Sequence, residues 1–222
     1  MMAHLGVDAA RIIEIGAREL SIELSGQQIQ SLARFLELIQ VWNRRFRLVG
    51  TRESRVQINK HILDCLAPAL VLSSIGTLVD IGSGAGLPGI PLSIGCPHMW
   101  VTLVDSRRAR ANFVREVVRQ LKLRNISVLE RRIERLVDDP AMRGSFDATI
   151  SRAWAELPKF LKVSAMLLRP GGIAVSMKGP KLQDELARLG EDDTLEFSPG
   201  RRIDYRLPEG GGQRTLLVFV RR

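Results

Sequence analysis

The stretch from Leu78 to Gly89, which reads LVDIGSGAGLPG, decides the fold of this chain. It opens with a short, mostly apolar strand that runs into glycines, and a helical segment follows. Glycines permit the tight turn that such a connection needs, and they let a ligand approach bare backbone. In an open parallel sheet this ligand lies beyond the carboxyl ends of the strands. The stretch therefore predicts the first strand, turn and helix of a ligand-binding α/β sheet.

Extended and helical patterns alternate after this stretch, which predicts a parallel sheet with helices on both faces. A glycine-rich loop at 208–212 separates the last two extended runs, so we expect an antiparallel pair there. Before the stretch, apolar residues at helical spacing predict a helical N-terminal extension, with Ser25 and Gln28 as a capping box. We expect the extension to span residues 1–70 and the core 71–222. Besides the helix capped by Ser25, the expected strands are 78–81, 100–104, 126–129, 146–151, 173–177, 195–205 and 215–220, and the expected helices are 8–24, 58–72, 107–121, 156–167 and 181–189.

Two cofactors fit a strand, a glycine turn and a helix. The run from Gly84 to Gly89 matches the G-x-G-x-x-G dinucleotide fingerprint, and Asp105 follows at about the spacing of a ribose-binding carboxylate. S-adenosylmethionine is favoured, because Asp80 suits a cationic sulfonium or amino group better than a phosphate. The turn at 168–172 and the C-terminal pair also resemble parts of class I methyltransferases. A nicotinamide-dependent oxidoreductase remains the alternative.

The composition points to a basic protein without a metal or membrane partner. The formal net charge is +9 and the pI is about 10.5, and a basic surface attracts polyanions such as nucleic acid. Two cysteines and three histidines give no basis for a disulfide framework or a metal site. No apolar run approaches the ~18 residues of a membrane helix. The N-terminus lacks the features of a signal peptide, so we expect a cytoplasmic protein.

A set of longer motifs is more specific than the glycines alone. They are Trp42-Asn43, His61-Ile62-Leu63-Asp64, the run from Gly82 to Pro91, Leu103-Val104-Asp105-Ser106, Arg132-Ile133-Glu134 and Ser151-Arg152-Ala153. In order and spacing they resemble the RsmG family, also called glucose-inhibited division protein B, over about residues 20–220. This family of bacterial methyltransferases modifies N7 of a guanine in the decoding-region loop of 16S ribosomal RNA. The resemblance implies a Rossmann-like class I S-adenosylmethionine-dependent methyltransferase with a seven-stranded, mostly parallel sheet.

The candidate cofactor site combines both lines of argument. The resemblance implies that the loop residues Gly82 and Leu87 contact the cofactor, and that Arg152 lies near its methionine end or the methyl-transfer pocket. It also implies that Ile133 and Glu134 contact the adenine end. The ends of the first two strands contribute further polar and glycine residues to this site. The complete set of cofactor-site candidates is Asp80, Gly82, Gly84, Leu87, Asp105, Ile133, Glu134 and Arg152.

The expected substrate is 16S ribosomal RNA or the small ribosomal subunit, bound by a monomer. Two departures from the family pattern fall in the N-terminal part, where Arg47 replaces a usual Asn and Cys65 a usual Ser. They affect the expected substrate contacts and leave the cofactor site intact. Candidate substrate contacts are Arg44, Arg45, Arg47, His61 and Lys178.

The residues also narrow the atom that is methylated. The segment after the fourth strand reads Ser151-Arg152-Ala153-Trp154, which lacks the Asn/Asp-Pro-Pro-aromatic motif of exocyclic amine methylation. Neither cysteine is placed as a nucleophile for carbon methylation, and a lysine-rich tetrad for ribose methylation is absent from the sequence. Guanine N7 has its own lone pair, so positioning can suffice and no general base is expected. Arg152 would then position the substrate. A basic RNA-binding module with a vestigial cofactor site is the remaining alternative.

Overall fold

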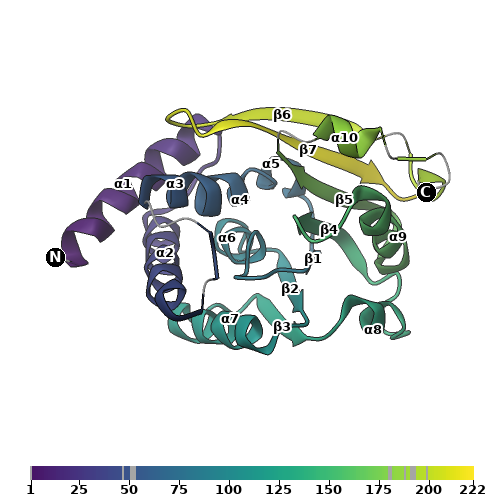
Figure 1. Cartoon of the computed structure of the whole chain (residues 1–222), viewed down its shortest axis with the longest axis horizontal. Coiled ribbons are helices and arrows are strands. Elements are labelled where there is room, and N and C mark those ends of the chain that lie inside the picture. Colours follow the sequence, from purple (N-terminus) through teal and green to yellow (C-terminus); the bar gives the residue numbers. More distant parts are fainter. Residues whose placement is uncertain are drawn as a thin grey trace.

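The computed structural model describes residues 2–46, 48–50, 54–179, 182–187, 189–190, 194–198 and 200–222. Its centre is one seven-stranded sheet in the order β3-β2-β1-β4-β5-β7-β6 (Figure 1). Five parallel strands are followed by an antiparallel pair, as the sequence predicts. The strands are β1 (Thr77–Ile81), β2 (Trp100–Asp105), β3 (Ile126–Glu130), β4 (Phe146–Arg152), β5 (Leu168–Lys178), β6 (Arg201–Leu207) and β7 (Gly212–Val220).

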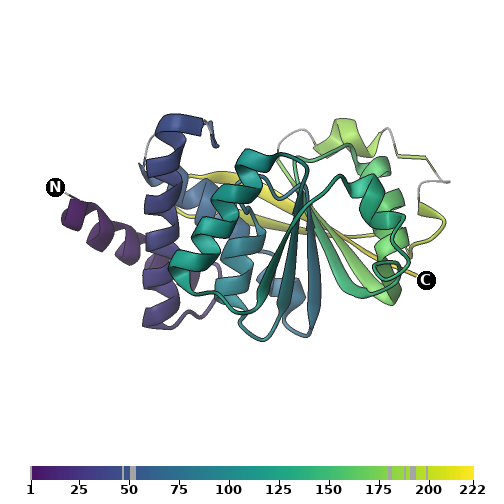
Figure 2. The same ribbon diagram turned by 90° about the horizontal axis from the view of Figure 1, so that it is seen from below.

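Helices cover both faces of the sheet, and Figure 2 shows the two groups on either side of the strands. Alternate residues of a strand point to opposite faces, so that Leu78 of β1 packs in one hydrophobic cluster and Val79 in the other. The first face carries α1 (Met2–Glu19), α2 (Gly26–Phe46), α6 (Gly89–Gly95) and α7 (Arg108–Leu121). The second face carries α8 (Ile133–Val137), α9 (Leu157–Leu167) and α10 (Leu182–Leu186).

The N-terminal helices share one hydrophobic core with the first face of the sheet. The capping box is confirmed: the amide of Ser25 donates to Gln28 Oε1 at 2.7 Å, and the amide of Gln28 donates to Ser25 Oγ at 3.3 Å. Gln28 Nε2 also donates to the carbonyl oxygens of Ile94 and Gly95 at the end of α6. The expected apolar stripe of α2 is buried and consists of Ile29, Leu32, Leu36 and Ile39.

The prediction of one continuous helix over 58–72 is wrong, because the structure divides this segment into shorter helices. The segment forms the π-helix η1 (Ile58–Leu63), α4 (Asp64–Leu66) and α5 (Ala69–Leu72), and the short helix α3 (Ser54–Gln57) precedes it. In the π turn, the amide of Asp64 donates to the carbonyl of Asn59, five residues earlier. Pro68 has no amide hydrogen and marks the break before α5. The wider turn changes which side chains of this segment face the sheet.

Several other boundaries differ from those expected. The turn at 168–172 lies within β5, since the backbones of Gly171 and Gly172 pair with Arg221 near the C-terminus. That pairing joins segments far apart in the sequence, so local turn signals do not reveal it. β6 begins at Arg201 rather than near 195, and α1 spans 2–19 rather than 8–24. Within the described residues, no helix has both the length and the apolar character needed to cross a membrane.

The turn after β1 gives a stability prediction for Gly86→Ala. Gly86 has φ +78°, and an added Cβ would overlap the buried side chain of Ile90. Gly171 is a matched control, because it has φ +77° but open space around its Cα. Gly171→Ala should cost only the left-handed backbone strain, about 1–2 kcal/mol. Gly86→Ala should cost about 1–3 kcal/mol more through overpacking. Urea denaturation measures both, and equal losses would contradict the steric argument.

Candidate active site

The glycine loop after β1 is fastened to the protein by its own backbone amides. Their acceptors are the carbonyl oxygens of Val104 and Ser83 and the carboxylate of Asp105, at 2.9 to 3.0 Å. Five amides are used in this way, those of Gly82, Ser83, Gly84, Gly86 and Leu87. These five amides already have acceptors within the protein, so they are not available to donate hydrogen bonds to a ligand.

Asp105 both closes the loop and faces the site. It is the last residue of β2 and is 8% exposed. Its Oδ2 accepts the Gly84 amide at 3.0 Å and lies 3.3 Å from Arg110 Nη1, and its Oδ1 accepts the Arg107 amide at 2.8 Å. Oδ1 keeps a second lone pair, so Asp105 can still accept a hydrogen bond from a ligand there, and a ligand that displaces Arg110 could use Oδ2 as well.

Asp80 lies beneath the loop and is fully buried. Its Oδ2 accepts the amide of Gly89 at the start of α6 at 2.9 Å, while its Oδ1 has no hydrogen-bond partner among the described residues. Burial raises the pKa of Asp80 to about 7, against the opposing effects of the Gly89 hydrogen bond and the charge of Arg152. A buried carboxylate with an unpartnered oxygen favours a nearby cation.

These contacts distinguish between the two cofactors. A pyrophosphate needs loop amides and a helix N-terminus that point toward it. Here five of the loop amides are engaged within the protein, and the Gly89 amide at the start of α6 donates to the carboxylate of Asp80 instead. A phosphate in this position would meet negative charge, whereas a sulfonium or ammonium group would meet a complementary one. The geometry therefore favours S-adenosylmethionine over a dinucleotide.

A cavity of about 260 Å³ opens beside Asp105 at the carboxyl end of the sheet. Four of the expected cofactor residues line it together, namely Gly82, Asp105, Ile133 and Glu134. The other lining residues are Val104, Ser106, Arg131, Arg132, Trp154 and Lys159. Lys159 Nζ lies 3.3 Å from Glu134 Oε1 and 5.0 Å from the centre of the Trp154 ring. Trp154 itself packs against Gly82, where any Cβ would overlap the indole.

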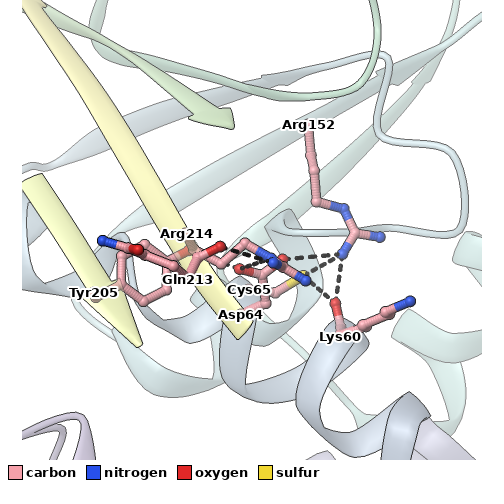
Figure 3. Close-up of polar contacts among 7 residues, drawn as sticks. All are labelled: Lys60, Asp64, Cys65, Arg152, Tyr205, Gln213 and Arg214. Carbon is pink, nitrogen blue, oxygen red and sulfur yellow. Dashed lines mark hydrogen bonds and ion pairs between the residues drawn. The ribbon is translucent and has the colours of Figure 1, made fainter. Parts of the chain in front are cut away.

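The remaining expected cofactor residues do not line this cavity. Leu87 is buried, and the amide of Gly84 stabilises the loop by donating a hydrogen bond to Asp105. Arg152, at the end of β4, turns toward the N-terminal helices (Figure 3). Its Nη1 donates to the carbonyl of Lys60 at 2.6 Å and to Cys65 Sγ at 3.3 Å, and it lies 3.8 Å from Asp64 Oδ2.

Cys65 lies closer to the candidate site than the sequence indicates, because its sulfur contacts Arg152. It is nevertheless fully buried, and burial raises the pKa of its thiol to about 12. A thiol that keeps its proton near neutrality is a poor nucleophile. Cys96 is also buried and follows α6. Both thiols therefore lack the character that a covalent mechanism requires.

The structure places the expected substrate residues in different environments. Arg44 is exposed near the end of α2, whereas the side chain of Arg45 and the whole of Arg47 lie outside the described residues. Lys178 is buried and its ammonium pairs with Glu185 of α10. His61 is buried in the π-helix, and burial, followed by the charge of Arg152, lowers its pKa to about 4. His61 is therefore neutral at pH 7. It can contact a nucleobase, but it cannot neutralise the charge of a phosphate.

Sequence reasoning missed two parts of this site. No sequence pattern indicated Lys159, because it lies on α9 and comes to line the cavity only when that helix packs in the folded protein. The partners of Asp64 were also missed: Tyr205 Oη donates to its Oδ1 at 2.6 Å, and Arg214 Nε lies 3.8 Å from the same oxygen. Burial raises the pKa of Asp64, although the Tyr205 hydrogen bond and the neighbouring charges oppose this. The described residues contain no group of metal-ligating side chains.

Comparison with known proteins agrees with these features. The family model described as rRNA small subunit methyltransferase G matches residues 28–202. A curated protein of Aromatoleum aromaticum named ribosomal RNA small subunit methyltransferase G is 40% identical, and the alignment covers 96% of this chain and 99% of the relative. A protein of the same name from Xanthomonas oryzae is 39% identical over 97% of each chain. The chain belongs to the rRNA small subunit methyltransferase G family. The resemblance that the motifs indicate is thereby confirmed.

Solved structures agree on the fold of this family member. A putative O-methyltransferase from Klebsiella pneumoniae aligns with a TM-score of 0.59 at 15% identity, over 86% of this chain and 90% of that one. A structure of M. jannaschii TYW2 in complex with AdoMet aligns with a TM-score of 0.51 at 16% identity, over 72% and 77%. The expected class I methyltransferase fold is confirmed. Family, fold and the polar groups around Asp80 and Asp105 all support S-adenosylmethionine as the cofactor.

The position of Asp105 gives a cofactor-binding prediction. Asp105→Ala should remove one or two charge-assisted hydrogen bonds to the ribose, each worth about 1.5–3 kcal/mol. Affinity for S-adenosylmethionine, measured by calorimetry, should fall at least ~10-fold. Glu130→Ala is the matched control, since Glu130 pairs with Asp105 in register at the same sheet edge and forms an ion pair with exposed Arg115. NAD should show no saturable binding to the wild type. Unchanged affinity in a folded Asp105→Ala protein would restrict Asp105 to holding the loop.

Proposed function

We propose that this chain transfers a methyl group from S-adenosylmethionine to N7 of a guanine in 16S ribosomal RNA. The observation that carries the proposal is its similarity, over nearly the whole chain, to relatives named ribosomal RNA small subunit methyltransferase G. The cavity beside Asp105 supports the cofactor half of the reaction. The oxidoreductase alternative is disfavoured, because the loop amides and Asp80 oppose a pyrophosphate.

The residues around the cavity divide the work of binding the cofactor. Asp105 accepts the ribose hydroxyls, and Gly82 provides a surface without a side chain. Ile133 and Glu134 border the adenine, with Ile133 packing against it. Asp80 supplies negative charge from beneath the loop. When bound, S-adenosylmethionine supplies a methyl group activated by its positively charged sulfur.

The protein groups near the expected methyl-transfer pocket suit positioning better than proton transfer. His61 is a weak base with a pKa of about 4, and the Cys65 thiol is not ionised near neutrality. The guanidinium of Arg152 is a poor proton acceptor but a good clamp for an oxygen acceptor. N7 attacks through its own lone pair, so orientation and exclusion of water are what the site has to provide.

A basic surface at the carboxyl edge of the sheet supports the RNA substrate. Arg34 of α2 contacts Gln120 late in α7, whereas Trp42 contacts Phe113 near its start, so the two helices are antiparallel. The end of α2, which carries exposed Arg44, therefore lies at the edge where α7 begins. Other exposed arginines near this edge are Arg107, Arg108, Arg131, Arg132 and Arg135. Together these cations can follow a phosphate backbone.

The remaining expectations belong to the same proposal. We propose that a cytoplasmic monomer acts on 16S ribosomal RNA, either bare or within the small ribosomal subunit. Residues 1–70 would provide much of the substrate side, and residues 71–222 would bind the cofactor. The shared hydrophobic core of the two parts supports a fixed relation between substrate and cofactor. A non-enzymatic RNA-binding module is disfavoured by the intact polar groups of the cofactor site.

The pH dependence of the reaction tests the chemistry. Under single turnover with saturating cofactor and RNA, the rate should stay level from about pH 6.5 to 9, since no group has to titrate. Burial raises the pKa of Asp80 to about 7, and a bound cation beside it should lower that pKa and keep the carboxylate ionised. His61 titrates well below this range. Mass mapping should place the methyl group on N7. A rate that rises tenfold per pH unit, or a methyl group on an exocyclic amine or ribose, would contradict the mechanism.

Salt dependence tests the RNA surface. Each phosphate contact that is lost should reduce the slope of log affinity against log salt by about 1. Arg44→Glu should show this reduction, and adding Arg45→Glu should extend it, without changing cofactor affinity. Arg124→Glu is the control, because exposed Arg124 precedes β3 at the opposite edge of the sheet and changes the net charge equally. Equal effects of Arg44→Glu and Arg124→Glu would argue against a defined surface.

A further inference from the structure

Three segments that are far apart in the sequence meet at the carboxylate of Asp64 (Figure 3). Asp64 directly follows the π-helix η1, and Arg152 ends β4. Tyr205 of β6 and Arg214 of β7 are paired directly across the C-terminal hairpin, so both reach the same face. The N-terminal helices, the parallel core and the hairpin are thus joined by one group of polar side chains.

Asp64 is held firmly within this group. It is 7% exposed, and its Oδ1 accepts a hydrogen bond from Tyr205 Oη at 2.6 Å. Arg214 Nε lies 3.8 Å from Oδ1, and Arg152 Nη1 lies 3.8 Å from Oδ2. Burial, followed by the charge of Asp64, raises the pKa of Tyr205, so the phenol keeps the proton that it donates. A buried carboxylate with partners on both oxygens has a defined orientation.

The guanidinium of Arg152 makes its polar contacts through one of its terminal nitrogens. Its polar contacts with the described residues, to Lys60, Asp64 and Cys65, all involve Nη1. Figure 3 shows the other terminal nitrogen of Arg152 pointing away from Asp64. The π-helix makes this arrangement possible, because it brings the Lys60 carbonyl and the side chains of the next turn to the same guanidinium.

We propose that Asp64, oriented by Tyr205, is a positioning residue that aims Arg152 at the methyl-transfer pocket. The contacts to Nη1 fix the plane of the guanidinium, and the opposite edge then presents its N–H groups to an oxygen acceptor of the RNA. A planar guanidinium transmits orientation well, because fixing one nitrogen fixes the direction of the others. This inference rests on the proposed function for the identity of the substrate.

A purely structural role is the competing explanation, in which Asp64 only joins the hairpin to the helices. The two explanations differ in how Asp64 depends on Arg152. A positioning residue loses its effect on the rate when Arg152 is absent, whereas a structural tie affects the rate equally with or without it. Double-mutant cycles measure this dependence directly.

The kinetic test uses Asp64→Asn and Tyr205→Phe, each alone and combined with Arg152→Ala. At saturating cofactor and 16S ribosomal RNA, each single variant should lower the single-turnover rate, by up to about 100-fold for Asp64→Asn, as expected when a reacting group is misplaced. Neither should lower the rate further in the Arg152→Ala background. Asp204→Asn is the matched control, because Asp204 adjoins Tyr205 but pairs with Arg202 and Thr215 instead. It should leave the rate unchanged.

A second readout does not depend on activity. In ¹⁵N spectra of the full chain, the guanidinium signals of Arg152, assigned with Arg152→Lys, should show hindered rotation in the wild type. The hindrance should be reduced in Asp64→Asn, where the Nη1 contacts to Lys60 and Cys65 remain, and reduced less in Tyr205→Phe, and it should persist in Asp204→Asn. Tyr205→Phe removes a single hydroxyl, so it keeps the test valid if Asp64→Asn does not fold.

The outcomes separate this inference from the proposed function. A wild type that shows the hindered Arg152 signal but does not methylate 16S ribosomal RNA would refute the proposed function and retain the Asp64–Arg152 contact. A wild type that does methylate the RNA, with effects of Asp64→Asn and Arg152→Ala that simply multiply, would overturn the positioning role. Unchanged Arg152 signals in both Asp64→Asn and Tyr205→Phe would overturn it as well.

Discussion

The turn between β1 and α6 is held by two carboxylates, and the arrangement of the site depends on them. Asp80 accepts the amide of Gly89 at 2.9 Å, and Asp105 accepts that of Gly84 at 3.0 Å. Hydrogen bonds to an ionised acceptor are stronger than neutral ones, and burial strengthens them further. Since β1 and β2 are adjacent parallel strands, both carboxylates stand at the same edge and hold the two ends of one loop.

This constraint explains why a glycine loop that matches a dinucleotide fingerprint suits a different ligand. Glycine makes the turn possible in both classes of protein. The direction of the loop amides decides whether the site favours an anionic or a cationic group of the ligand. With its amides turned toward Val104, Ser83 and Asp105, the loop offers carboxylate oxygens and bare backbone. The same contacts that stabilise the fold therefore select a cationic cofactor with a ribose.

The other half of the candidate site comes from the helical layer and the C-terminal hairpin. The N-terminal helices pack into the same core as one face of the sheet, so this packing sets their position relative to the strands. The π-helix then places Lys60, Asp64 and Cys65 around the guanidinium of Arg152. A side chain that ends a strand of the core is thereby oriented by residues 87 to 92 positions earlier in the chain.

Local patterns in the sequence determined the class of fold, the glycine turn, the Ser25–Gln28 capping box and the presence of Asp105 at a strand end. They also determined the family, because each of its motifs is a short continuous stretch of sequence. Tertiary structure alone decided that Asp80 is fully buried, that Lys159 borders the cavity, and that Arg152 turns toward Asp64 rather than toward Asp105. The physical reason is the distance along the sequence over which each kind of interaction acts. Turn geometry, helix capping and strand periodicity arise from residues a few positions apart, whereas burial and ion pairing depend on contacts that exist only after distant segments have packed together.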